Sequence, residues 1–580
     1  MGVLNGQLHT PGYASMWLKF RKPWSESQAL NQREGAAPET SLAAGCMNGP
    51  LRDRALWAVA AMAFAYLAVF TALTAYRFSL IGACYDLSVF EQSFWSLVNK
   101  GELLVNSQEG VEVGRFSHFS LHVSPLLLLV APLYALWQAP QTLLFAKTLA
   151  LALAAFPIYG LAARLLGSKG AGVAVAAIYL MYPPLHGVNL WGFHENEFAV
   201  APLAFMLFFH ETKRRRLFWA AAIAALCAKE TIALTVGAFG LYLLLFRKER
   251  LRGAALVAMA ALWFVACEQI VMPLFRGDQP MAGENVYIAM RYDPRLGTTY
   301  GEIAWTCLRH PLRVAAYALG EPLKRAYLFK LFFPLAFLPL LAPETLLICA
   351  PVLAQNLLAR YKGQFVILGQ YHAELIPFLF YGLCLGIGRA SRLAQLSRGF
   401  AENHEDPHAE SHNHRAPLTN DHSPVLPQPL GSMFIRRSLI GAALAAALAA
   451  NAAFELWPFA VGRTGQFQAS VLPPQRREAA RELLAMIPPE ASVLADWDLI
   501  SHLGARPWLH LIQQQALEAR PWDYIIYDSQ FPWLSDFTQA DFYRFLDSSD
   551  YQLVARKDGF FLFKKPQTPP PPPSDRAQGQ

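Results

Sequence analysis

Long apolar segments alternate with short polar breaks along most of this 580-residue chain. The first apolar segment, residues 55–76, carries no charged residue across 22 positions, and a helix of that length spans roughly 30 Å of hydrocarbon. The pattern predicts an α-helical polytopic membrane protein with about eleven transmembrane helices and further helices at the membrane interface. Ten further segments are expected to cross: 142–165, 170–185, 197–212, 217–228, 231–246, 254–275, 327–342, 344–358, 372–388 and 435–455.

Another apolar segment, 119–137, decides the topology because a histidine and two prolines interrupt it. If it crossed, the basic cluster 213–216 would lie on the opposite side from Arg54, although short basic loops usually stay in the cytoplasm. We predict that 119–137 lies at the outer interface, with a cytoplasmic N-terminus in the inner (plasma) membrane. The loop 276–325 is then external despite its seven basic residues; the bias weakens in long loops, and an external basic loop can meet phosphate.

Composition narrows the class of protein further. The chain is 54% hydrophobic and only 16% charged, with a mean hydropathy of +0.25, which excludes an ordinary soluble protein of this length. Its seven cysteines include no C-x-x-C pair, which argues against a disulfide framework and against a structural zinc site.

The organisation expected from these patterns has six parts. A cytoplasmic tail (1–54) precedes a transmembrane domain (55–398) with a large first outer loop (77–141). A polar, His-rich stretch (399–434) is expected to be a disordered cytoplasmic loop, the alternative being a weak metal-binding tract formed by His404, His408, His412 and His414. The last span (435–455), an external α/β domain (473–565) and a disordered Pro-rich tail (566–580) complete the chain.

The external domain is predicted from alternating short helices and strands. RREAARELLAMI is amphipathic, SVLADW and WDYIIYDS have the composition of buried strands, and GFFLFKK resembles a closing strand. DLISHLG and FYRFLDSS are expected to be helical.

Two carboxylates lie in the segment YDLSVFEQSFWSLVNKG that follows the first span. We expect a helix here that lies flat on the bilayer surface. Asp86 is either the N-cap of this helix or a general base held at the membrane edge. Glu91, five residues later, is a second catalytic candidate, although it projects roughly 140° away around the helix.

Two histidine-containing segments face the same outer side. His118 and His122 are spaced i, i+4, which brings them to one helix face, where they are either hydrogen-bonded structural residues or ligand contacts or, as the alternative, hold a metal ion. His194, Glu195 and Glu197 lead directly into the span 197–212. The acidic pair could simply complement the positive end of that helix, but three ionisable residues beside an apolar span exceed what capping needs.

Three more groups complete the list of candidates. Lys229 and Glu230 lie at an outer turn between apolar segments and are either an ordinary loop pair or a site for a phosphate. The motif QYHAELIPF supplies His372 and Glu374 at the outer end of another span, and the external loop supplies Arg291.

The order of these motifs carries a resemblance to a known family. The resemblance is carried, in this order, by the motifs YDLSVFEQ, SHFSLHVSPLLLLVAPLYAL, ARLLGS, YPPLHGVNLWGFHENE, an AKE turn and YHAELIPF. Between about Tyr85 and Pro377 the chain resembles a widespread family of prokaryotic membrane proteins designated domain of unknown function 2079. More distantly, the layout is similar to the GT-C superfamily of membrane glycosyltransferases, with Asp86 at the position of their first-loop catalytic acid. The chain lacks the Asp-Asp or Glu-Asp pair that many GT-C members carry there.

This resemblance implies a reaction and its partners. A sugar would move from a polyprenyl-phosphate donor to a lipid, glycan or protein acceptor at the outer face, with inversion at the anomeric carbon and no nucleic acid involved. Asp86 would serve as the base, Lys229 and Arg291 would stabilise the phosphate, and His118, His122, His194 and Glu195 would line the site. A divalent metal ion is a possible cofactor, but no metal ligand is assigned. Two alternatives are a transporter or flippase, which usually shows repeated halves and midplane charges, and a non-catalytic envelope assembly protein.

The topology can be tested with cysteine labels. Labels at position 195 and within 473–565 should react with an impermeant reagent from the outer face, whereas labels near 214 and 410 should not. A reporter fused after Gln138 should behave as external. Outer-face labelling at 214 would contradict the predicted topology.

Overall fold

The computed structural model describes residues 53–82, 85–109, 113–277, 284–405, 430–454, 471–530 and 538–566. Three parts of the predicted organisation lie outside the described residues: residues 1–52 of the N-terminal tail, the Pro-rich tail from 567, and the histidines His408, His412 and His414. The predicted disordered loop 399–434 is helical at both ends, because α21 (Ile376–Glu405) runs into it and α22 (Leu430–Ala453) begins inside it. That part of the prediction is wrong at both boundaries.

Within the described ranges, five helical segments are long and apolar enough to cross a membrane. A sixth forms if α9 (Lys169–Leu180) and α10 (Pro183–Leu190), bent by 44°, count as one broken span. The five segments are α4 (Arg54–Ser79); α7 (Pro140–Leu153) with α8 (Ala155–Leu166); α14 (Arg250–Ala266) with the π-helical turn η5 (Cys267–Val271) and α15 (Met272–Arg276); Ala373–Gln395, which joins η9 (Ala373–Leu375) to α21; and Met433–Ala453 within α22.

Four other predicted spans occur as shorter helices. They are α11 (Val200–Glu211), α12 (Arg215–Leu226), α13 (Ile232–Leu245) and α20 (Pro343–Leu358), with 12 to 16 residues each. Helices of that length reach only about 18–24 Å, less than the hydrocarbon thickness. A count of eleven crossings therefore stays a prediction.

The segment 327–342 is not the single helix that its apolar pattern predicts. α19 (Pro322–Phe332) ends there and is followed by two 3-10 turns, η6 (Phe333–Leu335) and η7 (Leu338–Leu341). Pro334 and Pro339 interrupt the helical hydrogen bonds, and Ala336 and Phe337 adopt positive φ angles of 50° and 56°. The chain therefore reverses where a continuous helix was expected.

The first outer loop and the loop 276–325 contain short elements. After α5 (Tyr85–Lys100), the strands β1 (Val105–Asn106) and β2 (Phe116–Ser117) pair antiparallel. The predicted interfacial segment forms the turns η2 (His118–Ser120) and η3 (Pro125–Val130) and the helix α6 (Ala131–Leu136), all too short to cross. Three helices that the sequence did not predict, α16 (Glu284–Arg291), α17 (Tyr300–Arg309) and α18 (Pro311–Gly320), occupy the second loop.

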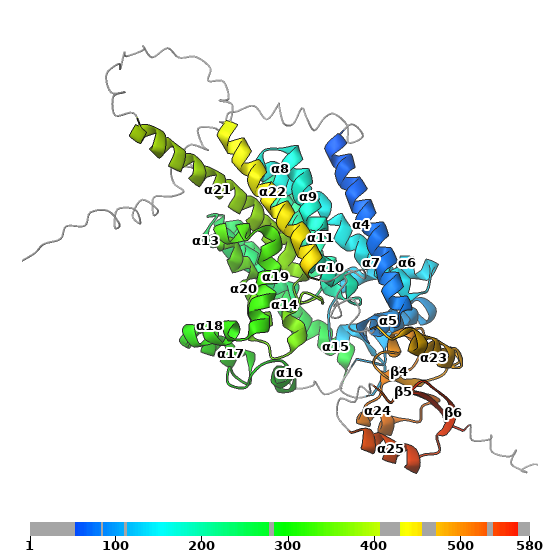
Figure 1. Ribbon diagram of the computed structural model, residues 1–580. Coiled ribbons are helices and arrows are strands. Elements are labelled where there is room, and N and C mark those ends of the chain that lie inside the picture. Colours follow the sequence, from blue (N-terminus) through cyan, green and yellow to red (C-terminus); the bar gives the residue numbers. More distant parts are fainter. Residues whose placement is uncertain are drawn as a thin grey trace, which may run out of the picture. The chain divides into compact units, whose positions relative to one another are not determined.

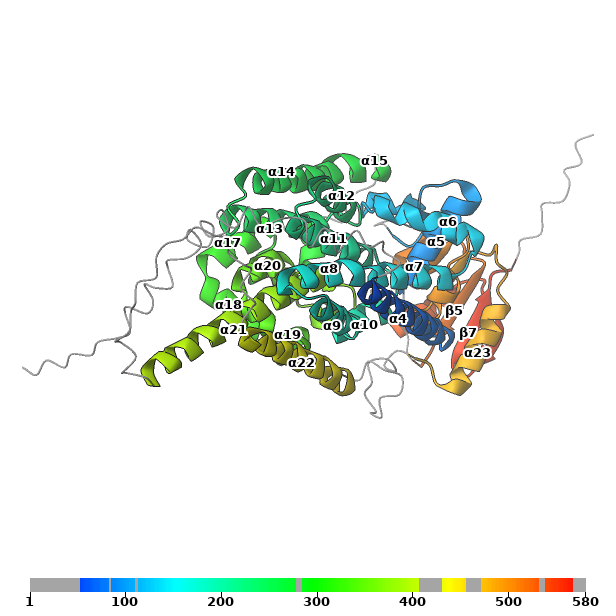
Figure 2. The ribbon, with the colours of Figure 1, turned by 90° about the horizontal axis from the view of Figure 1, so that it is seen from above.

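Residues 471–566 form a mixed five-stranded sheet in the order β4-β3-β5-β7-β6, called here the C-terminal unit (Figure 1). β3 (Val493–Ala495) is parallel to both β4 (Leu509–Leu511) and β5 (Tyr524–Asp528), whereas β7 (Phe560–Lys564) is antiparallel to β5 and to β6 (Gln552–Lys557). Helix α23 (Pro474–Ala485) packs against β6 and β7 (Figure 2), and α24 (Gln514–Ala519) and α25 (Gln539–Ser548) complete the unit. Helices and strands therefore occur together where the α/β domain was predicted, but DLISHLG forms only a 3-10 turn at Ile500–His502.

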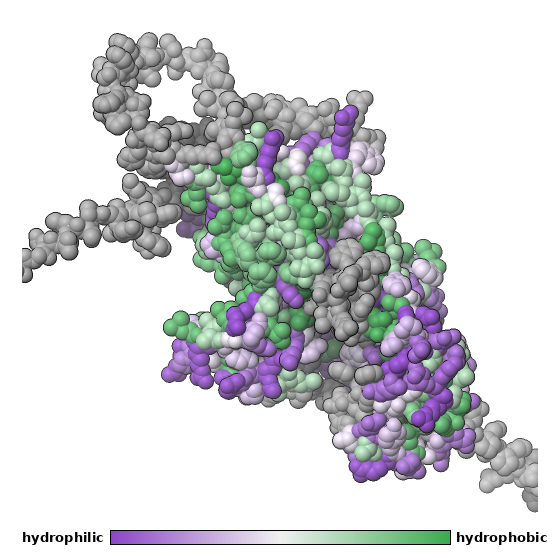
Figure 3. All heavy atoms as spheres, viewed as in Figure 1, coloured by the Kyte–Doolittle hydropathy of each residue, from purple (hydrophilic) through white to green (hydrophobic). Residues whose placement is uncertain are grey.

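The surface of the molecule divides by polarity in the way a membrane protein requires. Figure 3 shows hydrophobic residues over the long helices, whereas hydrophilic residues gather on the C-terminal unit and occur together with hydrophobic ones around α17 and α18. Apolar side chains that remain exposed on the long helices include Phe64, Leu262 and Ile270, at 65% to 71%. These positions have lipid as their natural neighbour.

Close packing of α21 can be tested at two glycines of the same helix. A Cβ atom on Gly386 would lie 2.0 Å from the backbone oxygen of Leu338, whereas one on Gly388 would meet nothing within 4 Å. Gly386→Ala should lower the free energy of unfolding by roughly 1–3 kcal/mol, as overpacking does. Gly388→Ala should raise it slightly, because alanine favours helices by up to about 1 kcal/mol. Thermal unfolding in detergent measures both, and equal effects would contradict the packing described.

Candidate active site

Asp86 lies inside the first turn of α5, as its second residue. It is therefore not the N-cap, which was one of the two roles that the sequence left open. Its carboxylate oxygen Oδ2 lies 3.1 Å from Nε2 of His194, and its side chain is 40% exposed whereas that of His194 is 4% exposed. Asp86 is thus a partly accessible carboxylate held by a buried histidine.

His194 is held from its other side by Glu197. The imidazole Nδ1 lies 3.6 Å from Glu197 Oε1, and the backbone N–H of His194 donates to Glu197 Oε2 at 3.2 Å. Burial lowers the pKa of His194, but the carboxylates of Asp86 and Glu197 outweigh burial and raise the pKa to about 9. At neutral pH His194 is therefore an imidazolium, and its positive charge holds the Asp86 carboxylate beside it.

A second buried histidine, His118, lies between two carboxylates. Its Nδ1 lies 2.9 Å from Glu109 Oε2, and its Nε2 lies 3.3 Å from Glu195 Oε1. Burial lowers the pKa of His118, but these two carboxylates raise it to about 10. His118 is therefore also protonated: Nδ1 donates to Glu109, and Nε2 makes a charge contact with Glu195.

Glu195 connects this histidine to Lys229, whose Nζ lies 3.3 Å from the same oxygen, Oε1. Burial raises the pKa of Glu195, but Lys229, His118 and His122 hold it well below its usual range. Only 2% of Glu195 is exposed, so the labels within 473–565 give the cleaner outer-face test. Lys229 and Glu195 form a fixed ion pair beside the histidines.

His122 and Glu230 form the neighbouring pair. Nδ1 of His122 lies 3.0 Å from Glu230 Oε1, and the backbone N–H of Val123 donates to Oε2 of the same carboxylate at 3.0 Å. The i, i+4 spacing does bring His118 and His122 together, with ring centroids 5.8 Å apart, but on one irregular turn instead of a long helix. The turn is joined to the Lys229 turn, because the Leu126 N–H donates to the Cys227 carbonyl.

Two buried cations hold the backbone just before His194. Arg77 donates to the carbonyl oxygen of Leu190 at 3.2 Å and lies over the Trp191 ring, and Lys147 donates to the carbonyls of Trp191, at 2.6 Å, and Gly192. These carbonyls lie at or just beyond the C-terminal end of α10, where backbone acceptors lack intrahelical partners. Sequence reasoning missed both cations, although a lysine within the apolar segment 142–165 was a readable signal.

Arg291, the last residue of α16, contacts two aromatic residues, Tyr371 directly and Tyr361 through it. The Arg291 guanidinium lies 6.0 Å from the ring centre of Tyr371, which is 6.3 Å from that of Tyr361. Burial raises the pKa of Tyr371 to about 12. Tyr371 was overlooked although it begins the YHAEL motif.

Glu374 joins the edge of the cluster through buried hydrogen bonds. Thr235 donates to its Oε2 at 2.5 Å, and Asn196, the residue between Glu195 and Glu197, donates to its Oε1 at 3.5 Å. His372, from the same motif, is directed elsewhere: its Nε2 contacts the Pro184 carbonyl at 3.0 Å. His372 therefore packs against α10, and it does not point toward Asp86 and His194.

Glu91 is likewise separated from Asp86, because it faces the C-terminal unit. A Cβ on Gly504 would lie 2.3 Å from Glu91 Oε2, and the adjacent Gln92 donates to the Arg506 carbonyl at 3.0 Å. Nearly every residue of α5 from Leu87 to Phe94 is buried. The helix is thus covered by protein, and the C-terminal unit contacts its polar residues Glu91 and Gln92. Its orientation relative to the bilayer stays a prediction.

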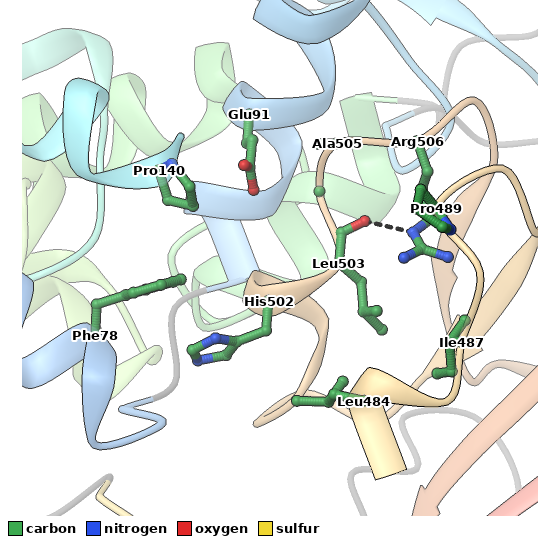
Figure 4. Close-up of a pocket in the computed structure, with 11 residues that line it drawn as sticks. Phe78, Glu91, Pro140, Leu484, Ile487, Pro489, His502, Leu503, Ala505 and Arg506 are labelled. Atoms are coloured by element: carbon green, nitrogen blue, oxygen red, sulfur yellow. Dashed lines mark hydrogen bonds between the residues drawn. The ribbon is translucent and has the colours of Figure 1, made fainter. Parts of the chain in front are cut away.

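A cavity of about 380 Å³ lies on this Glu91 side (Figure 4). Phe78, Pro140 and Glu91 line it from the helices, and His502, Leu503 and Arg506 are among the residues that line it from the C-terminal unit. The ring of His502 stacks on that of Phe78 with centroids 4.1 Å apart. The cavity shares no lining residue with the charged group around Asp86, called here the Asp86 cluster: Asp86, Glu109, His118, His122, His194, Glu195, Glu197, Lys229 and Glu230. The cluster is the better candidate for a catalytic site because it contains a partly exposed carboxylate and several paired charges.

In the part of the chain that the structure describes, no three His, Cys, Asp or Glu side chains are arranged to hold a metal ion. We therefore assign no metal ligand here.

The family described as "Predicted membrane protein (DUF2079)" matches residues 77–403, more than half of the chain. The chain belongs to the DUF2079 family. The resemblance inferred from the motifs is confirmed, and the matched region extends beyond 85–377 at both ends. The DUF2079 region contains all the residues of the Asp86 cluster and ends before α22 and the C-terminal unit.

Solved structures show weaker similarity to this DUF2079 member. ArnT from Cupriavidus metallidurans bound to undecaprenyl phosphate is 14% identical, with a TM-score of 0.45 over 86% of this chain and 97% of that chain. Its apo state has the same identity and TM-score, and covers 98% of that chain. The Archaeoglobus fulgidus oligosaccharyltransferase complex with Zn and sulfate is 12% identical, with a TM-score of 0.37 over 77% and 62% of the two chains. These likenesses are too weak to decide activity, and no curated protein matches the sequence.

The buried Glu91 gives this DUF2079 protein a testable pH dependence. Burial raises the pKa of Glu91 to about 8 from an ordinary 4.5, against the smaller opposing effects of Arg506 and of a hydrogen bond from the Gly504 backbone. The folded state therefore favours the protonated carboxyl. The stability from this group is complete below about pH 4.5 and is lost as the pH rises toward 8.

Glu91→Gln should remove this loss. The difference in unfolding free energy between variant and wild type should grow with pH by at most about 1.4 kcal/mol per unit, the limit for one proton, and level off above pH 8. Denaturation of both proteins across pH 5–9 measures it, and the subtraction cancels the histidines, which also titrate. Parallel curves would show that Glu91 is not buried as described.

Proposed function

We propose that this protein is a membrane glycosyltransferase that moves a sugar from a polyprenyl-phosphate donor to an acceptor hydroxyl at the outer face of the membrane. The observation that carries the proposal is a partly exposed carboxylate, Asp86, in contact with His194, whose neighbour in the chain, Glu195, is paired with the cation Lys229. Transfer to a hydroxyl from a phosphate leaving group needs both a base and positive charge.

Asp86 is the base in this proposal. His194 engages Oδ2 and is fixed by Glu197, so Oδ1 is the oxygen directed to the acceptor. A carboxylate held in one orientation avoids the entropy cost of aligning it during the reaction. His194 and Glu197 are therefore positioning residues.

Lys229 and Arg291 supply the positive charge for the leaving phosphate. Lys229 is oriented by Glu195, which is itself fixed by His118, and Arg291 is placed beside Tyr371. Fixed cations stabilise developing negative charge more effectively than mobile ones because they need no rearrangement. His122, Glu230 and Glu374 support the loops around them.

The proposed step is a direct displacement. The acceptor oxygen forms a bond to the anomeric carbon, the bond from that carbon to the phosphate oxygen breaks, and its electron pair leaves with the polyprenyl phosphate. The acceptor proton passes to Asp86 and is then released to water. Inversion at the anomeric carbon follows from attack opposite the leaving group.

The partners follow from this chemistry. The donor is a lipid held in the inner membrane, which suits a site at the edge of apolar helices, and the acceptor is a lipid, glycan or protein hydroxyl outside. The proposed orientation has a cytoplasmic N-terminus and an external C-terminal unit.

Asp86→Asn tests the base. The amide keeps the size of the side chain but cannot accept the proton, so transfer from a polyprenyl-phosphate sugar to an acceptor panel should fall by a factor on the order of a hundred or more. Purified protein in nanodiscs with radiolabelled donors gives the measurement, and size-exclusion and thermal unfolding check folding. Asp550→Asn, at an exposed residue of the C-terminal unit, is the matched control and should retain full activity.

Lys229→Ala should give a different kinetic signature, with weaker donor binding as well as slower transfer. Full transfer by a folded Asp86→Asn protein would exclude Asp86 as the base. Donor flipping without transfer by the wild type would instead support a flippase.

A further inference from the structure

Three consecutive elements, α17, α18 and the start of α19, expose large apolar side chains along the external loop. Trp305 is 62% exposed, Leu308 77% and Leu312 85%, and Leu319 and Leu323 are 47% and 45% exposed. We call these five residues the apolar ledge. Single exposed leucines are common on proteins, but a contiguous series rimmed by charge marks an interaction surface.

The apolar ledge is the outer face of helices whose other face is packed. In α17, Trp305 and Leu308 are three residues apart, and in α18, Leu312 and Leu319 are seven apart, so each pair shares a helix face. The opposite faces are buried in a small core with Leu358 of α20, to which α17 contributes Ile303 and α18 contributes Ala318. The ledge is therefore presented by a fixed support.

Neither helix can cross a bilayer. α17 and α18 have 10 residues each, about 15 Å of helix, and Pro311 separates them. Short amphipathic helices with tryptophan and leucine on one face lie in the plane of a membrane, with their apolar side chains between the headgroups and the acyl chains.

Basic and acidic side chains both lie beside the apolar ledge. Arg309 and Arg313 are exposed, and neither forms an ion pair with a carboxylate among the residues that the structure describes. Of the nearby carboxylates, Asp293 is paired with Arg295 and Glu321 with Lys324, whereas Glu302 accepts hydrogen bonds from Thr298 and keeps its charge. The positive charge is thus available to an anionic partner.

We propose that the apolar ledge docks on the outer leaflet of the membrane, with Arg309 and Arg313 bound to the phosphate groups of anionic phospholipids. Leucine and tryptophan side chains account for insertion, and the two guanidinium groups account for a preference for anionic headgroups. The proposal does not depend on the proposed transferase activity.

Photo-crosslinking in the full-length protein tests the insertion. p-Benzoylphenylalanine is placed at position 308 or 312 in nanodiscs of 70% phosphatidylcholine and 30% phosphatidylglycerol, a composition of roughly membrane-like charge. Position 262, exposed on α14, is the positive control, and position 553, an exposed leucine on β6, is the negative control. We expect lipid adducts at positions 308 and 312. They should be at least half as abundant as those at position 262 and at least tenfold more abundant than those at position 553. Adducts at the level of 553, or adducts only to protein, would overturn the proposal.

The lipid class tests the arginines. Phosphatidylglycerol should form at least twice its molar share of the adducts at 308, and the double variant Arg309→Gln/Arg313→Gln should return it to that share. The matched variant Arg309→Lys/Arg313→Lys keeps the charge and should retain the enrichment. Adducts that mirror the bulk lipid composition in the wild type would contradict anionic binding.

Discussion

The arrangement of the site depends on how the chain satisfies the backbone carbonyl groups where α10 ends. A helix terminus inside a membrane protein has no water to accept its unpaired groups, so side chains must meet them. Arg77, from the end of α4, and Lys147, from α7, donate to carbonyls of residues 190–192. Because the next ionisable residue is His194, these bonds fix the position from which its ring reaches Asp86. Three segments that are far apart in sequence are thereby held at one point.

The charges of the site are organised as alternating pairs, which explains how so many ionisable groups tolerate burial. Burying a lone charge is destabilising because the charge loses its hydration, whereas oppositely charged neighbours offset part of that desolvation penalty. Glu195 contacts both His118 and Lys229, and the carboxylates hold the histidines protonated instead of letting burial neutralise them. Asp86 stands at the accessible end of this arrangement. An apolar substitution within it would leave the remaining partners unpaired.

The two carboxylates of α5 serve different surfaces of the protein. Their spacing predicted that they do not share a helix face, and the contacts of Asp86 with His194 and of Glu91 with Gly504 agree with it. Most polar residues at breaks between apolar segments were found to be neighbours, because chain reversals on one side of a helical bundle bring such breaks together. His372 was an exception: position along the chain does not show which way a side chain turns. Glu109 had no local signal at all, since only its contact with His118 distinguishes it from other loop acids.

The sequence by itself determined the apolar helices, the membrane class, the family and most strands and helices of the C-terminal unit, because periodicity and composition are local properties. It missed β4, only three residues long, and the exposed edge strand β6, whose formation depends on pairing with β7. The break in 327–342 had a local signal in Pro334 and Pro339. Tertiary structure alone decided that the C-terminal unit covers α5 and that two buried cations hold the loop before His194. Each of these results from contacts between distant segments, and such contacts are fixed by packing and by the need to satisfy buried polar groups, not by the pattern of neighbouring residues.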